Sequence, residues 1–233
     1  MKKLTLTLLT CLIFLSPNVV MSETFRDLVL RDGLFYKRSS EVPFTGKITG
    51  KVNGLFKNGK PEGTWFTFKD GQFHTKSNYK NGKKEGVSVG YWDNGQVSIK
   101  GNYKNGKKEG AWFYYHKNGR LRSTSNYRNG KRDGKIAIYY DNGQLDAKGN
   151  YKNGKAEGTW FTYNKDGQFH TKGNYKNGKK EGVWVGYWDN GQLTYKGNWN
   201  NGKQEGVWVS YNKDGTVNKK NTGTFKNGKK ISD

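Results

Sequence analysis

The sequence predicts an all-β protein: an elongated, single-layer antiparallel meander of tandem β-hairpins, each about 24 residues long. Three observations predict this fold. The tripeptide N-G-K returns at nearly constant steps, a second Asn-Gly or Asp-Gly pair stands about midway between successive N-G-K turns, and the residues between the turns alternate in polarity. A fixed period of this length is typical of proteins in which each unit packs only on its neighbours.

The N-G-K turns set the repeat. Successive turns are separated by 23, 24, 24, 24, 24, 24 and 26 residues. Asn-Gly and Asp-Gly favour the positive φ angles of a two-residue type I′ turn, so each N-G-K, and each second Asn-Gly or Asp-Gly pair, predicts a tight turn between two antiparallel strands. The asparagines of these turns are Asn58, Asn81, Asn105, Asn129, Asn153, Asn177, Asn201 and Asn227.

Further columns keep the same step. An acid and a glycine follow each of the first seven turns, from Glu62-Gly63 to Glu205-Gly206, with Asp133 as the one variant acid. Because an acid recurs in every unit, we predict a structural role for it at the turn rather than a catalytic one. The segment 62–86 returns at 157–182 with one residue inserted, which indicates that a block of four repeats was duplicated.

The residues between the turns predict strands. In QLTYKGNW, Leu193, Tyr195 and Trp199 share one face, and the polar residues between them take the other. Alternation with period two, bounded by hairpin turns, is typical of antiparallel strands, so about seven repeats predict about fourteen strands. Several glycines stand opposite aromatic residues, where bare backbone would let a ring lie flat: Gly101, Gly173 and Gly197 are among them.

Tryptophans form a column of their own. We expect this column to be the core of a thin sheet, and the alternative that it offers stacking platforms for sugar rings or bases stays open. Trp92 and Trp188 lie off the column, at strand ends beside a D-N-G turn, so we expect them to be exposed and take them as candidate partner-binding residues. The column holds Trp65, Trp112, Trp160, Trp184 and Trp208, with Ser88 and Ile136 at the remaining positions.

Lysines crowd the turns and give the chain a net charge of +23. One interpretation is a basic stripe that binds nucleic acid, acidic lipid head groups or anionic envelope polymers. The other is solubility and protection of an open sheet against pairing with its copies. The lysines that we take as candidate partner-binding residues are Lys107, Lys108, Lys179 and Lys180.

A nucleotide site is excluded by the same repeats. The pattern G-x-x-x-x-G-K, as in Gly101 to Lys107, is most of a phosphate-binding loop. It recurs six times, never followed by Ser or Thr, and the next element is a predicted strand where a phosphate-binding loop needs a helix. The histidines are dispersed and no G-x-S-x-G is present. We therefore predict a protein that is not an enzyme and has no cofactor and no metal site.

Residues 1–22 have the layout of a secretory signal peptide. Two lysines precede the apolar run 4–15, and Ser16-Pro17 ends it. Ser22 occupies the last position before an expected cleavage at Glu23. The apolar run is too short to cross a bilayer as a helix, and no later segment resembles a transmembrane span.

The single cysteine, Cys11, lies inside this leader. Lipoprotein processing at Cys11 is an alternative, but it would leave most of the apolar run behind the cut. The chain after residue 22 has no cysteine, so we expect it to fold without disulfides. The expected location is the periplasm or the cell exterior.

The unit GNYKNGKKEGVWVGYWDNGQLTYK closely resembles the MORN repeat in its bacterial variant form, which fills YwqK-type antitoxin-like proteins. The resemblance covers residues 54–230 nearly continuously, so we expect a repeat array there, preceded by a divergent N-terminal capping segment over 23–53. It implies a meandering sheet of hairpins, protein–protein interaction and, as in some eukaryotic MORN proteins, contact with acidic lipids. It implies no catalysis by the repeats.

Together these observations predict an exported, non-enzymatic interaction scaffold for a protein partner that the sequence does not identify. The alternative is a binder of anionic envelope material, such as acidic lipid, a glycan polymer or nucleic acid. A YwqK-type antitoxin-like role is a further alternative. It would require the cytoplasm, whereas the leader predicts export.

Overall fold

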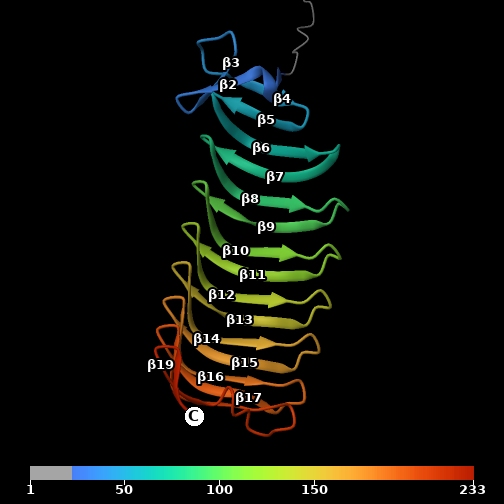
Figure 1. Ribbon diagram of the computed structural model, residues 1–233. Helices are drawn as coiled ribbons and strands as arrows, with labels where there is room; N and C mark the ends of the chain where they lie inside the picture. Colours follow the sequence, from blue (N-terminus) through green and yellow to red (C-terminus); the bar gives the residue numbers. More distant parts are fainter. Residues whose placement is uncertain (1–22) are drawn as a thin grey trace, which may run out of the picture.

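The computed structural model describes residues 23–233, which form one long antiparallel sheet beside a small hairpin (Figure 1). The sheet has 18 strands, and from β4 onward each strand pairs with its neighbours in sequence. β1 departs from this order because it pairs with β4 in parallel. The expected leader, 1–22, and Ser22 of the expected cleavage site lie outside the described residues.

The fourteen strands from β5 to β18 are the seven predicted hairpins, and the sheet is longer because β1, β4, β19 and β20 extend it. In spatial order the strands are β1 (Glu23–Thr24), β4 (Gly46–Thr49), β5 (Val52–Lys57), β6 (Lys60–Lys69), β7 (Gln72–Lys80), β8 (Lys83–Tyr91), β9 (Val97–Lys104), β10 (Lys107–Tyr115), β11 (Leu121–Arg128), β12 (Lys131–Tyr139), β13 (Leu145–Lys152), β14 (Lys155–Tyr163), β15 (Phe169–Lys176), β16 (Lys179–Tyr187), β17 (Leu193–Asn200), β18 (Lys203–Ser210), β19 (Gly223–Lys226) and β20 (Lys229–Ser232). The separate hairpin is β2 (Leu28–Arg31) with β3 (Leu34–Lys37), and a 3-10 turn, η1 (Phe25–Asp27), precedes it. The predicted all-β, single-layer antiparallel meander is confirmed.

The N-G-K turns are tight two-residue turns, as predicted. Their asparagines all have φ between 49° and 52°, and each is followed by a glycine with positive φ. These turns lie at the left of Figure 1 and form what we call the turn edge of the sheet.

The opposite edge, at the right of Figure 1, differs from the prediction. Its first connection, Asp70-Gly71, is a two-residue turn in which both residues have positive φ. The later connections hold three residues, and only the glycine has positive φ. Gly95, for example, has φ 80°, and the Trp92 N–H donates to the Gln96 carbonyl across the loop at 2.8 Å. The extra residue gives a three-residue hairpin loop in place of the type I′ turn. We call this side the loop edge.

A bulge follows each turn and interrupts the alternation that the sequence predicted. Glu109 pairs with Asn102, but the next pair on the other side is Phe113 with Lys100, so three residues face Gly101 alone. Gly110 begins the bulge with φ 67°, a conformation that favours glycine. The acid–glycine column is therefore also a column of bulges.

The bulge lays each tryptophan on the glycine across the strand pair. A Cβ on Gly101 would lie 2.2 Å from Cδ2 of Trp112, so no larger residue fits there without displacing the ring. The two units without tryptophan have serine in place of that glycine: Ser77 pairs with Ser88, and Ser125 pairs with Ile136. The same contact joins Gly54 to Trp65, Gly149 to Trp160, Gly173 to Trp184 and Gly197 to Trp208.

Each tryptophan also packs edge-on against the aromatic residues that precede the turns. Trp160 lies between Tyr151 and Tyr175 at 5.4 and 5.7 Å between ring centroids, and Tyr175 continues to Trp184 at 5.2 Å. Such pairs contribute about 0.5–1.5 kcal/mol each beyond the area that they bury. Trp65, Trp112, Trp184 and Trp208 are buried, which confirms the column as the core.

Hydrogen bonds tie each turn to the unit before it. The Asn201 N–H donates to Oε2 of Glu181 at 2.9 Å, and the Gly202 N–H donates to the Lys180 carbonyl at 2.9 Å. The acid column thus has the structural role that the sequence predicted. The other acid–amide bonds, 2.7–3.1 Å long, are Glu62 with Asn81, Glu85 with Asn105, Glu109 with Asn129, Asp133 with Asn153, Glu157 with Asn177 and Glu205 with Asn227.

Residues 23–53 cover the first hairpin. Thr45 takes the place of the acid, since its hydroxyl accepts from the Asn58 N–H at 2.8 Å. This segment contributes Leu28, Phe44 and Ile48 to one buried cluster, which Phe56 and Trp65 of the first repeat complete.

We expect Gly173→Ser to lower the free energy of unfolding by about 1–3 kcal/mol, because the new Cβ overlaps the Trp184 ring. Urea titration followed by circular dichroism measures this. The control is the double variant Gly173→Ser, Trp184→Ile, which recreates the Ser125–Ile136 pair and should recover part of the loss. Equal urea midpoints for the single variant and the wild type would contradict the packing argument.

We expect Glu181→Ala to leave the Asn201 N–H without its acceptor, costing about 1 kcal/mol and speeding hydrogen exchange of that amide. Exchange followed by NMR or mass spectrometry measures the effect. Glu181→Asp is the control, since Asp133 makes the same bond at 3.1 Å. Unchanged protection of Asn201 in the alanine variant would show that the bond does not hold the turn.

Candidate binding surfaces

The turn edge carries a row of exposed lysines. Two flank each Asn-Gly pair in most repeats, and successive turns are two strands apart, or about 10 Å. The lysine that follows one turn also lies close to the next turn. A Cβ on Gly202, for example, would lie 3.7 Å from Cβ of Lys179, which follows the preceding turn. The exposed cations of this edge are Lys57, Lys60, Lys80, Lys83, Lys104, Lys107, Arg128, Lys131, Lys152, Lys155, Lys176, Lys179, Lys203, Lys226 and Lys229.

The loop edge has a different charge pattern, because its lysines stand beside aspartates. Lys213 pairs with Asp189 at 2.8 Å, and Lys165 lies 3.9 Å from Asp141. On the turn edge, by contrast, most repeats place one acid beside two exposed cations, and that acid is bonded to a backbone amide. Positive charge is therefore in excess on the turn edge.

The four candidate lysines divide into two kinds. Lys107 and Lys179 are exposed on the turn edge. Lys108 and Lys180 are half-buried, with Nζ 4.1 Å from the ring centroid of Trp112 and 4.3 Å from that of Trp184. Burial lowers the pKa of both ammonium groups. These two belong to the aromatic core of the sheet as cation–π partners rather than to its free surface.

Trp92 and Trp188 lie beside the loops, as predicted, but half-buried rather than exposed. The indole N–H of Trp92 donates to the Tyr115 carbonyl at 3.2 Å, and that of Trp188 donates to the Tyr211 carbonyl at 3.2 Å. Each bond reaches the unit that follows. His116 occupies the same position and bonds the Tyr139 carbonyl in the same way, at 3.0 Å. The residue at this position therefore links one repeat to the next, and each tryptophan ring remains partly accessible.

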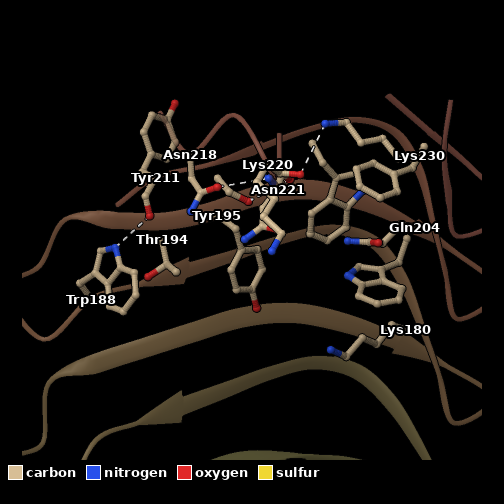
Figure 2. A pocket seen from close by; sticks show the side chains of 14 residues that line it. Lys180, Trp188, Thr194, Tyr195, Gln204, Tyr211, Asn218, Lys220, Asn221 and Lys230 are labelled. Carbon is tan, nitrogen blue, oxygen red and sulfur yellow. Dashed lines mark hydrogen bonds between the residues drawn. The ribbon is translucent and has the colours of Figure 1, made fainter. Parts of the chain in front are cut away.

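A groove of about 680 Å³ opens near the C-terminal end of the described chain (Figure 2). It forms where residues 219–222, after the loop at 213–215, depart from the hairpin pattern before β19 begins. Tyr195 stacks on Trp208 at 5.8 Å with an interplanar angle of 23°. Figure 2 shows Tyr195 between this connection and Lys180. The groove is also lined by Trp199, Phe225, Asn218, Asn221, Lys220 and Lys230.

Thr194 and Trp199 line this groove, and Oγ1 of the first and Nε1 of the second are buried without a hydrogen-bond partner in the protein. The exposed Lys220 at the rim would favour an anionic group, whereas Nζ of Lys230 is already paired with Asp233 and donates to the Lys219 carbonyl. This groove could not be predicted from the sequence, because its residues come from several strands and from a connection without alternation. The 26-residue step between Asn201 and Asn227 was the signal that this unit is irregular.

Within residues 23–233 no group of three or more His, Cys, Asp or Glu could hold a metal ion. That same part of the chain has no helix long and apolar enough to cross a membrane.

Five tandem segments match the family described as MORN repeat variant: residues 84–105, 108–129, 132–153, 156–177 and 180–201. Each segment begins just after one turn and ends at the next, so it contains one strand, one loop and the returning strand. The resemblance to MORN repeats is confirmed for these units. A comparison with curated proteins gave no match.

Burial of Lys180 predicts a pH effect on stability. Between the lowered pKa of the folded state and 10.5, the unfolded chain binds more protons, so the contribution of Lys180 to stability rises with pH. We expect the free energy of unfolding of the wild type, minus that of Lys180→Met, to rise as pH approaches 10.5. Urea titrations from about pH 8 upward measure this difference.

The matched control is Lys179→Met, which removes an ammonium from the neighbouring exposed position. Tyrosine ionisation is common to all three proteins and cancels in the differences. A pH dependence no steeper for Lys180→Met than for Lys179→Met would contradict the burial argument.

Proposed function

We propose that this chain, in which five tandem segments match the MORN repeat variant, is an exported, non-enzymatic scaffold that binds a partner protein. The observation that carries this proposal is the C-terminal groove. Its aromatic floor and the exposed Lys220 at its rim suit an extended segment with an acidic side chain. Elsewhere in each repeat, the recurring acids and tryptophan N–H groups are mostly used to hold the sheet together.

Two observations support export. Residues 1–22 have the layout of a signal peptide, with two lysines before a short apolar run and Ser22 before the expected cleavage at Glu23. The chain after Cys11 contains no cysteine, so folding in an oxidising compartment needs no disulfide.

The lysines of the turn edge favour a second function, binding of an anionic envelope polymer or acidic lipid. Exposed cations recur there about every 10 Å. Binding of this kind releases counterions, so its affinity falls steeply with salt, whereas a buried aromatic contact is less sensitive to salt.

A retention experiment distinguishes the two functions. Residues 23–233 are immobilised and exposed to envelope and culture extracts at about 0.15 M and 0.5 M salt. One protein retained at both salts, and lost with Lys220→Glu in the groove, supports the scaffold. If that protein is a toxin, the role would be that of an antitoxin. A mixed anionic eluate that disappears at high salt supports the polymer function and overturns the scaffold.

For the polymer function, we expect a variant with Lys107, Lys131, Lys155 and Lys179 all replaced by Gln to bind polyphosphate more weakly. The slope of log affinity against log salt should become shallower by up to about 0.7–0.9 per lost phosphate contact. Titration by fluorescence anisotropy measures both quantities.

The control variant replaces four loop-edge lysines by Gln: Lys69, Lys117, Lys165 and Lys213. Both variants lose the same net charge, so a general effect of charge would weaken binding equally. Equal losses would show that the turn edge is not the binding surface.

A further inference from the structure

Two grooves on the loop edge are built from the same seven residue types. The first, of about 580 Å³, is lined by Gln72, Phe73, Tyr91, Trp92, Asp93, Asn94 and Gly95. The second, of about 570 Å³, is lined by Gln168, Phe169, Tyr187, Trp188, Asp189, Asn190 and Gly191. Each residue of the second lies 96 positions after its counterpart, which is four repeats.

The repeats between and beyond the grooves lack this combination. The phenylalanine position holds Val97, Leu121, Leu145 or Leu193, and the tryptophan position holds His116, Tyr140, Asn164 or Asn212. Tyrosine recurs in every unit and therefore does not mark the grooves. Phe, Tyr and Trp come together at one loop junction near each end of the array. Both junctions lie on the same edge of the sheet, at the loops after β8 and β16 (Figure 1).

The floor of each groove is aromatic and fixed in place. Phe73 packs against Tyr91 at 5.0 Å, and Phe169 packs against Tyr187 at 5.3 Å. The tryptophan N–H groups are already bonded to backbone carbonyls. Trp92 and Trp188 therefore offer a ligand the apolar surface of a ring rather than a hydrogen bond.

The rim of each groove is polar and mixed in charge. A glutamine amide and an aspartate lie on it, and a lysine stands beside each groove: Lys117 Nζ is 5.7 Å from the Trp92 ring, and Lys213 bonds Asp189. An anionic ligand would meet the aspartate, and a cationic ligand would meet the lysine. Neutral hydroxyl groups suit both, because they donate to carboxylate and accept from ammonium or amide.

We propose that the two grooves bind a neutral, linear polysaccharide at two points. The apolar face of a sugar ring would stack on the aromatic floor, and its hydroxyls would bond the rim. Eight strands separate the grooves, or roughly 40 Å along the sheet. A polymer that reaches both grooves gains avidity, which a short oligosaccharide confined to one groove cannot gain.

The chain supplies a replacement for the tryptophans that preserves the fold. His116 stands at the same position in its repeat and makes the same hydrogen bond to a carbonyl of the following repeat. Trp92→His and Trp188→His therefore remove the large indole surface and keep the hydrogen bond between repeats. His116→Trp, outside both grooves, is the matched control. Trp188 also lines the C-terminal groove, so Trp92→His is the variant that leaves the proposed partner-protein site untouched.

The experiment is affinity electrophoresis in gels that contain hydroxyethyl cellulose, mannan or dextran, at about 0.15 M salt and again at about 0.5 M salt, which screens the lysines. We expect at least one polymer to retard the wild type and His116→Trp equally. Each single Trp→His variant should lose affinity at least about tenfold, and the double variant should migrate as it does without polymer. Melting curves confirm that the variants are folded.

Three outcomes would overturn the proposal: no retardation by any of the polymers, retardation that persists in the folded double variant, or retardation that disappears at high salt. None of them bears on the partner-protein scaffold, which rests on the C-terminal groove and is tested by Lys220→Glu.

Discussion

The contact between a tryptophan ring and the bare backbone of a glycine is the interaction on which this sheet depends. A single-layer sheet has no second layer against which to bury apolar surface, and a lone hairpin is marginal in water. The bulge after each turn solves this problem by laying the Trp112 ring on Gly101, and the same arrangement recurs along the chain. The aromatic residues before the turns close the gaps between successive tryptophans, so the core runs as a thin line along the sheet.

The turn edge and the loop edge of the sheet differ in their balance of charged side chains. On the turn edge, acids such as Glu181 hold backbone amides, and the exposed cations outnumber them by about two to one. On the loop edge, aspartates lie beside lysines, as Asp189 does beside Lys213. One edge therefore carries an excess of positive charge, and the other presents aromatic residues among mixed charges.

Much of the fold could be predicted from the sequence, because turns and alternation are local properties. The positive φ of Asn201, the strand pattern around Tyr195 and the burial of Trp184 all follow from neighbouring residues and the repeat. The bulge at Gly110 could not be predicted, since glycine after an acid is equally compatible with a turn. The candidate binding surfaces were harder to predict than the fold, because they depend on contacts between repeats. Lys108 and Lys180 looked like surface charges until the packing of the rings beside them was known.

The two units that lack tryptophan have a mechanical consequence. At Ser77–Ser88 and Ser125–Ile136 the large ring is missing, so less surface is buried between those strands than in the units around them. In a chain whose stability is a sum over neighbours, such units are compliant points. A force or a thermal fluctuation would bend or open the sheet at β7–β8 and β11–β12 first. The units from β13 to β18, which all carry a tryptophan, would be disturbed later. The sheet would then behave as a stiff C-terminal half joined to a more elastic N-terminal half.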